Sequence, residues 1–253
     1  MKEFAGAIIT FSRPNYYKQL MTSLENAVDN DFDWFVFQDG IENAKIRDGK
    51  ERFLNKELVE KNIFITKNSK LNIKEHFISK NNIKINAQIN KVITLFSDYK
   101  TLFIFEDDLV VSPYYLRLLK KCSIQYPNIV ASFHSIKKGK SPEQLKFLAK
   151  ADAPRLWGFY LTRNVWDKFS SLWNNFYKKG VYAPFYDVIF TKFIRDHTEG
   201  KYEPLVSRAY NIGIDGILST NKVSWKKRCL DKQDKKIEYN EDKTLSGFIL
   251  KGR

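Results

Sequence analysis

Four short apolar runs in the first half of the chain constrain its fold more than any other feature. They are residues 4–11 (FAGAIITF), 32–37 (FDWFVF), 63–66 (IFIT) and 101–105 (TLFIF). Continuous apolar runs of this length are typical of strands that are buried on both faces of a sheet. Because segments with helical character separate them, the sequence predicts a doubly wound α/β sheet with flanking helices and right-handed crossovers.

The spacing of apolar residues between the runs supports this alternation. Pro14 suits the first turn of a helix, and Tyr17, Leu20, Met21 and Leu24 follow it at helical spacing. Further along the chain we expect helices in the second half of 72–97, over 163–173 and over 185–196, and strands over 129–133, 157–161 and 202–207.

Polar residues follow three of the expected strands directly. They are Ser12-Arg13, Gln38-Asp39 and Glu106-Asp107-Asp108. In open α/β sheets, ligands bind in the crevice beyond the carboxyl ends of the strands. The sequence therefore predicts that one crevice collects all three groups.

The three consecutive acids Glu106, Asp107 and Asp108, called the acid triplet below, close the strand 101–105. Three carboxylates in a row repel one another unless a cation or solvent relieves the repulsion. Hard cations such as Mg²⁺ and Mn²⁺ take carboxylate and phosphate oxygens together. We therefore expect a divalent cation here that neutralises charge on a leaving diphosphate.

Composition and charge restrict the setting of the protein. The chain has 253 residues, of which 43% are hydrophobic, and this suits one large domain with a sizeable core. The formal net charge of +14 favours a polyanionic partner or surface, such as DNA or an anionic membrane, with solvated lysines as the alternative. Cys122 and Cys229 lack metal-ligand spacing, so we expect free thiols.

No signal-peptide pattern and no run of ~20 apolar residues is visible in the sequence. We therefore expect a protein without a transmembrane segment. Its predicted location is the cytoplasm or the inner face of a membrane, or the host cytoplasm for a phage protein.

The segment FIFEDDLVVSPYYL resembles the donor-metal motif of GT-A glycosyltransferases and is most similar to that of the N-acetylglucosaminyltransferase I group. Further segments resemble this group in the same order over roughly residues 4–220: the first strand with Arg13, FVFQDG, WGFYLTRNVW and EPLVSRAYNIGIDG. The resemblance implies a GT-A (Rossmann-like) mixed sheet, a nucleotide-sugar donor that carries UDP, and Mn²⁺ or Mg²⁺ as cofactor.

The resemblance also implies roles for individual residues. Asp108 is expected to be the direct metal ligand, whereas Glu106 and Asp107 contact the ribose and sugar of the donor or tune the ligand. The other expected donor-binding residues are Arg13 (phosphate or base), Asp39 (base) and Arg208 (diphosphate).

Such enzymes invert the anomeric carbon by direct displacement and need a carboxylate base for the acceptor hydroxyl. In the family this base lies in an acidic pair, but the matching stretch FYDV (residues 185–188) keeps one acid, Asp187, and Val188 falls on the position of the family's base. Asp187 remains the predicted catalytic base because its apolar neighbours would raise its pKa. Asp196 and Asp215 are the alternatives.

His134, Trp157 and Tyr186 are further candidates for contacts with the donor or the sugar, and for each of them a structural role is the alternative. We expect residues 1–221 to form the GT-A domain, with 1–108 as its nucleotide-binding half and 109–221 as its acceptor and catalytic half. Residues 222–253 are expected to form a basic C-terminal extension.

Three functions are compatible with the sequence. The first is a metal-dependent, inverting transfer of a sugar to the hydroxyl of a glycan or lipid-linked glycan. The second is a phage-type DNA glycosyltransferase that acts on hydroxymethylated pyrimidines. The third is a non-catalytic GT-A-like binding module that kept the fold and lost its base.

Overall fold

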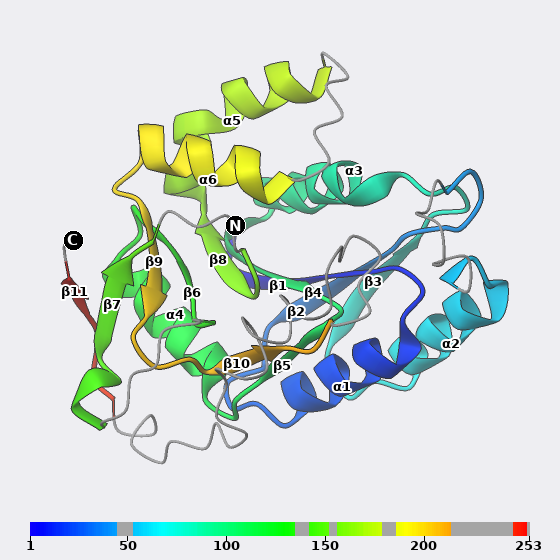
Figure 1. Cartoon of the computed structure of the whole chain (residues 1–253), viewed down its shortest axis with the longest axis horizontal. Helices are drawn as coiled ribbons and strands as arrows, with labels where there is room; N and C mark the ends of the chain where they lie inside the picture. Colours follow the sequence, from blue (N-terminus) through cyan, green and yellow to red (C-terminus); the bar gives the residue numbers. More distant parts are fainter. Residues whose placement is uncertain (45–52, 135–141, 152–155, 179–185, 214–244, 252–253) are drawn as a thin grey trace, which may run out of the picture.

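A computed structural model describes residues 1–44, 53–134, 142–151, 156–178, 186–213 and 245–251. Within these residues the strands form one nine-stranded mixed sheet and a separate two-stranded sheet, and helices cover both faces of the large sheet (Figure 1). The predicted doubly wound α/β fold with flanking helices is confirmed.

The order of strands in the large sheet is β11-β7-β9-β6-β8-β4-β1-β2-β3, and β10 pairs with β5 in the small sheet. The strands are β1 (Lys2–Thr10), β2 (Asp33–Gln38), β3 (Ile73–Ile78), β4 (Tyr99–Glu106), β5 (Leu109–Val111), β6 (Val130–Ser132), β7 (Phe147–Lys150), β8 (Phe159–Thr162), β9 (Lys201–Pro204), β10 (Ala209–Asn211) and β11 (Ile249–Lys251). The helices are α1 (Pro14–Glu25), α2 (Lys56–Lys67), α3 (Lys84–Val92), α4 (Tyr115–Gln125), α5 (Arg163–Lys178) and α6 (Tyr186–His197), with 3-10 turns at Ile93–Ser97 and Pro142–Gln144.

The two faces of the sheet carry separate cores because side chains alternate along each strand. Helices α1, α2 and α4 cover one face, and α3, α5 and α6 cover the other (Figure 1). In β4, Phe103 and Phe105 join the first core, whereas Leu102 and Ile104 join the second. Gly6 in β1 leaves room for the buried ring of Trp34, which a Cβ at this position would overlap.

The central strand β1 lies at the point where the direction of winding reverses. It pairs in parallel with β2 on one side and with β4 on the other. The chain leaves β1 through α1 towards β2 and β3, and it returns through α3 to β4. Such a switch point opens a crevice at the carboxyl ends of the two strands, which is where ligands bind in sheets of this type.

The predicted strand over residues 63–66 is wrong, because these residues lie within α2. Asn55 is the N-cap of this helix, and its side chain accepts a hydrogen bond from the amide of Glu57. The helix buries Val59, Asn62 and Thr66 at helical spacing. Three apolar residues followed by a threonine fit a buried strand and a helix equally well by pattern alone. The third strand is instead β3, an edge strand that alternates in burial only weakly.

The expected elements of the second half are present as β6, β8, α5, α6 and β9, with their ends shifted by a few residues. The predicted boundary at residue 221 falls within 214–244, which lie outside the described residues, as do Cys229 and Asp215. Residues 245–251 of the predicted extension run along the sheet, where β11 pairs with β7 and the buried Phe248 packs on Phe133.

Two further expectations concern thiols and membranes. Cys122 is a free, buried cysteine that lies next to the hydroxyl of Tyr160. In the part of the chain that the structure describes, none of the helices combines the length and the apolar character that a membrane crossing requires.

Candidate functional site

The acid triplet lies at the carboxyl end of β4, beside the end of β1, where Ile9 pairs with Glu106. Its three side chains take different directions. Glu106 reaches Tyr186 at the start of α6, Asp107 turns inward to the end of β1, and Asp108 turns to Asn211 at the end of β10. The triplet therefore joins three distant parts of the chain.

Asp107 is buried and held by the end of β1. Its Oδ2 accepts hydrogen bonds from the Thr10 hydroxyl at 3.1 Å and from the Phe11 amide at 3.2 Å. Helix α2 supports this arrangement through Asn62, whose amide donates to Thr10 Oγ1 at 2.8 Å and to the Phe11 carbonyl at 3.0 Å. Because Asn62 donates to the Thr10 oxygen, the hydroxyl proton of Thr10 is left to point at Asp107.

Replacing Asn62 by alanine is expected to lower the free energy of unfolding by about 1–3 kcal/mol, because buried polar partners lose their donor. Chemical denaturation of the variant and the parent measures the difference. Asn68→Ala, an exposed asparagine at the end of the same helix, is the matched control and should stay within about 0.5 kcal/mol of the parent. An Asn62 variant as stable as this control would show that the network does not hold the site together.

Arg13 bridges Asp107 and Asp108 from the N-cap position of α1. Its Nη2 pairs with Asp107 Oδ1, and its Nη1 pairs with Asp108 Oδ2 at 3.0 Å. Only 12% of the Arg13 side chain is exposed. Burial opposes its charge, but the Asp107 and Asp108 carboxylates outweigh burial and raise the pKa of Arg13 further above its usual value.

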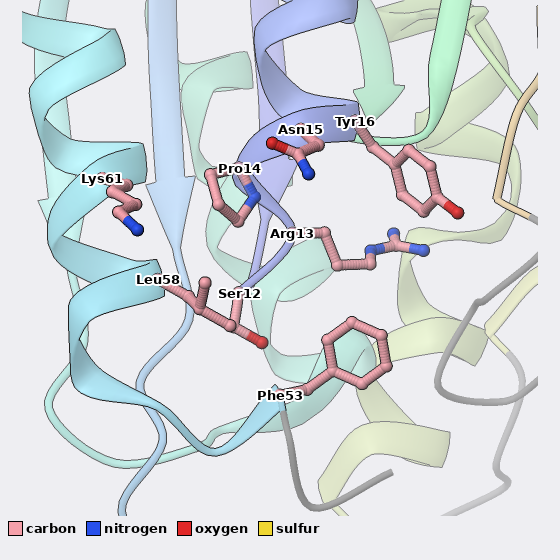
Figure 2. Close-up of a pocket in the computed structure, with 8 residues that line it drawn as sticks. All are labelled: Ser12, Arg13, Pro14, Asn15, Tyr16, Phe53, Leu58 and Lys61. Carbon is pink, nitrogen blue, oxygen red and sulfur yellow. The ribbon is translucent and has the colours of Figure 1, made fainter.

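Arg13 also borders a pocket of about 480 Å³ between the first turn of α1 and the start of α2. Figure 2 shows the residues that line it: Ser12, Arg13, Pro14, Asn15, Tyr16, Phe53, Leu58 and Lys61. The Ser12 hydroxyl oxygen points towards the side of the pocket where Phe53 lies. This oxygen is buried and has no hydrogen-bond partner among the described residues.

Asp108 is oriented by the last residue of β10 and by the two residues that follow it. Its Oδ1 accepts a hydrogen bond from the Asn211 amide at 3.2 Å, and its backbone carbonyl accepts from the Ile212 amide at 2.7 Å. A Cβ at Gly213 would overlap the carboxylate of Asp108, so only glycine leaves this carboxylate its present place. The backbone at Gly213 thus packs closely against Asp108 and places no side chain over its carboxylate.

Glu106 connects the triplet to helix α6. The hydroxyl of the buried Tyr186 donates to Glu106 Oε1 at 2.8 Å. Burial, together with the negative charge of Asp108, raises the pKa of Glu106 to about 8. The triplet thus contacts α6 through Glu106 and contacts Arg13 through Asp107 and Asp108.

Asp187 follows Tyr186 in the first turn of α6, so the contact of Tyr186 with Glu106 brings this turn to the triplet. Burial raises the pKa of Asp187 to about 6. Asp196 lies at the opposite end of α6, where it pairs with Arg195 in solvent. Of the acids proposed as a base, Asp187 is therefore the one that the described residues place beside the triplet.

Two predicted donor-binding residues, Asp39 and Arg208, make hydrogen bonds within the protein. The carboxylate of Asp39 accepts hydrogen bonds from the amides of Gly40, Ile83 and Lys84, and so fixes the turn into α3. Arg208 is fully buried and donates to the carbonyls of Val206 and Leu145. The expected crevice therefore collects Arg13 and the triplet, while Asp39 lies at the same sheet edge with its carboxylate already engaged.

The side chains near the triplet permit one way of holding a divalent cation. No cluster of three or more His, Cys, Asp or Glu side chains suited to a metal ion occurs among the described residues. The described residues therefore do not form a complete set of protein ligands for a metal ion. Mg²⁺, however, is commonly held by one or two carboxylates plus substrate phosphates. Asp108, in the cradle at Gly213, fits that kind of shared coordination.

The remaining aromatic candidates pack against other side chains. His134 is buried at the end of β6, and its ring meets that of Trp157 edge to face, with 4.7 Å between ring centroids. Tyr186 packs on Phe190 in the core and reaches the site through its hydroxyl. Core packing thus describes His134 and Trp157 well, whereas Tyr186 takes part in both the core and the site.

Sequence reasoning missed Asn62, Asn211 and Gly213. Asn62 was hidden because its neighbours were assigned to a strand, although an asparagine on the buried face of a helix is a signal of a polar partner. Asn211 and Gly213 belong to the segment AYNIGIDG, in which only the glycine-bearing loop was noted.

No family model matches the sequence, and no curated protein matches it. Among solved structures, the chain is similar to S. aureus TarS, with 12% identity over 82% of this chain and a TM-score of 0.49. It is also similar to residues 1–349 of TarS in complex with UDP-GlcNAc (13% identity, TM-score 0.48) and with UDP (13% identity, TM-score 0.49), again over 82% of this chain. The aligned part spans 36% of the longer TarS chain and 58–60% of the shorter one. At this identity and these TM-scores, the likeness is one of general architecture.

Proposed function

We propose that this protein transfers a sugar from a nucleotide donor, with UDP as the nucleotide, to an acceptor hydroxyl with the help of Mn²⁺ or Mg²⁺. The observation that carries the proposal is the convergence at the switch point of the sheet. There the acid triplet meets Arg13 from the start of α1 and the turn of α6 that bears Asp187. In the proposal, this set would supply a cation ligand, a phosphate partner and a proton acceptor at one end of the sheet.

Each residue has a distinct task in this proposal. Asp108 would hold the cation together with the donor diphosphate, and the cation, when bound, neutralises charge on the leaving diphosphate. The guanidinium of Arg13 offers paired donors to phosphate oxygens. Glu106, which accepts a hydrogen bond from the Tyr186 hydroxyl, would contact the ribose or sugar of the donor.

Asp187 would take the proton of the acceptor hydroxyl as that oxygen attacks the anomeric carbon. The bond from the sugar to the diphosphate breaks as the new glycosidic bond forms, and this direct displacement inverts the anomeric centre. A pKa of about 6 leaves Asp187 ionised at neutral pH and still basic enough to accept a proton. Val188, where the resembling family carries its base, is exposed and apolar, so Asp187 would act alone.

Release of UDP from nucleotide sugars in the presence of Mn²⁺ tests this function. We expect slow hydrolysis of at least one UDP-sugar without any acceptor, and we expect EDTA to abolish it. Binding of the nucleotide sugar without turnover, with or without glycan and DNA acceptors, would identify a non-catalytic binding module instead. Hydrolysis that persists in EDTA would show that the reaction does not require the proposed cation.

The acceptor we propose is a glycan or a lipid-linked glycan. A DNA acceptor is the second candidate, and the formal net charge of +14 is the observation that favours it. If the acceptor is DNA, duplex affinity should fall steeply with salt, with a slope that matches several phosphate contacts. Sugar transfer to duplexes with hydroxymethylated pyrimidines, together with no transfer to glycans, would identify DNA as the acceptor.

A further inference from the structure

Asp107 and Asp108 already share a cation in this structure, namely the guanidinium of Arg13. The two ends of this contact differ in how firmly they are held. Asp107 is fixed by Thr10 and by the Phe11 amide in addition to Arg13. Asp108 has the Asn211 amide on its other oxygen, and its Oδ2 pairs with Arg13 at 3.0 Å. Arg13 thus pairs with a firmly held carboxylate at Asp107, and its contact with Asp108 is the one that can be released.

We propose that Arg13 takes the place of the divalent cation on Asp108 in the donor-free protein and thereby makes the binding of cation and nucleotide cooperative. This inference rests on the proposed function, because it concerns the cation site assigned there to Asp108. It adds that Arg13 must release Asp108 before that carboxylate can serve as a metal ligand.

The surroundings of Arg13 provide a place for the released group. Arg13 borders the pocket shown in Figure 2, and its guanidinium lies 5.7 Å from the ring centroid of Tyr16, which can hold a cation on its face. The first turn of α1 has no capping side-chain hydrogen bond and no acidic residue. With the unpartnered Ser12 hydroxyl beside it, this turn favours an anionic group such as a phosphate. A diphosphate in the pocket would therefore give Arg13 a new partner.

Charge balance explains why the two ligands should depend on each other. Two carboxylates share one guanidinium at this point. A divalent cation that entered alone would face the positive charge of Arg13 across a few ångströms in a buried site, where repulsion is strong. A diphosphate removes that repulsion by pairing with both cations. Cation and nucleotide should each raise the affinity of the other, as linkage requires.

Titration of the full chain with Mn²⁺, followed by the electron paramagnetic resonance signal of the free ion, tests the inference without measuring turnover. We expect Arg13→Gln to bind Mn²⁺ about tenfold more tightly than the parent in the absence of UDP. The enhancement of Mn²⁺ affinity by UDP should shrink by a similar factor. In thermal denaturation, Mn²⁺ alone should raise the Tm of this variant clearly more than it raises the Tm of the parent.

Three further variants make the result specific. Arg13→Met is a second neutral replacement, for use if the glutamine variant does not fold. Arg13→Lys keeps the positive charge and should resemble the parent in weak binding of Mn²⁺ alone. Arg117 lies away from the site and pairs with the carboxylate of Asp29 through two of its nitrogens. Arg117→Gln removes this arginine and should leave Mn²⁺ binding unchanged.

The outcomes separate this inference from the proposed function. Equal Mn²⁺ affinity and equal UDP enhancement in the parent and both neutral variants would overturn the role of Arg13 and leave the cation site intact. Absence of Mn²⁺ binding in the parent and the variants, with and without UDP, would remove the cation site itself.

Discussion

Replacing Asp108 by alanine is expected to reduce turnover of the nucleotide sugar by ~10³-fold or more, because stabilisation of the leaving diphosphate by a cation contributes several kcal/mol. The fold should survive, because Arg13 keeps its pairing with Asp107 and the buried strand β4 is unchanged. Steady-state rates of UDP release, with saturating Mn²⁺, measure the first effect. The second is measured by the midpoint of thermal unfolding.

The control for this variant is Asp98→Ala. Asp98 is an exposed carboxylate beside the opposite end of β4, next to Ser97, so its loss should leave both rate and stability near those of the parent. Asp108→Asn keeps the shape of the side chain and should lose nearly as much activity as the alanine variant, because the charge is removed. Undiminished turnover in both Asp108 variants would show that this carboxylate holds no catalytic cation.

Replacing Asp187 by asparagine is expected to lower turnover by ~10²- to 10⁴-fold, the range typical of a lost general base, while donor affinity stays unchanged. The parent should also show a characteristic dependence on pH. Burial raises the pKa of Asp187 to about 6. Below that pH the carboxylate is protonated and cannot accept a proton, so the rate should fall about tenfold per pH unit. Above it the rate should level off.

The pH dependence separates a base from a merely structural carboxylate. In Asp187→Asn the acidic limb with its midpoint near pH 6 should disappear from the residual rate. Asp196→Asn, at the far exposed end of the same helix, should keep both the rate and the limb. A parent-like rate and pH profile in the Asp187 variant would place the base elsewhere.

Much of the fold could be predicted from the pattern of apolar residues. The runs at 4–11, 32–37 and 101–105 correspond to β1, β2 and β4 because a strand buried on both faces must be apolar throughout. The strand predicted at 63–66 was wrong because the apolar run is short and lies within a helix that is capped by Asn55 and has polar residues beside the run. The short strands β5, β7 and β10, of three or four residues each, were not predicted from the sequence.

Some features of the candidate site were also evident from the sequence, and others were not. The acid triplet was evident from its place after an apolar strand, and Arg13 from its place after the first strand. The pairing of Arg13 with Asp107 and Asp108 was not evident, because it joins positions more than ninety residues apart. The internal hydrogen bonds of Asp39 and Arg208 were not evident either, because their residue types suggested ligand binding alone.

The sequence by itself determined the alternating sheet, the strand ends at which polar groups gather, and the acids on which the proposed chemistry depends. These follow from local rules of burial and periodicity that act on neighbouring residues. The tertiary structure alone decided which carboxylate faces which partner, because β1 and β4 become neighbours only when the chain winds back across β1. That winding brings Asn211 and Tyr186 to the acid triplet and Asn62 to Thr10, and no local pattern encodes contacts made across such distances along the chain.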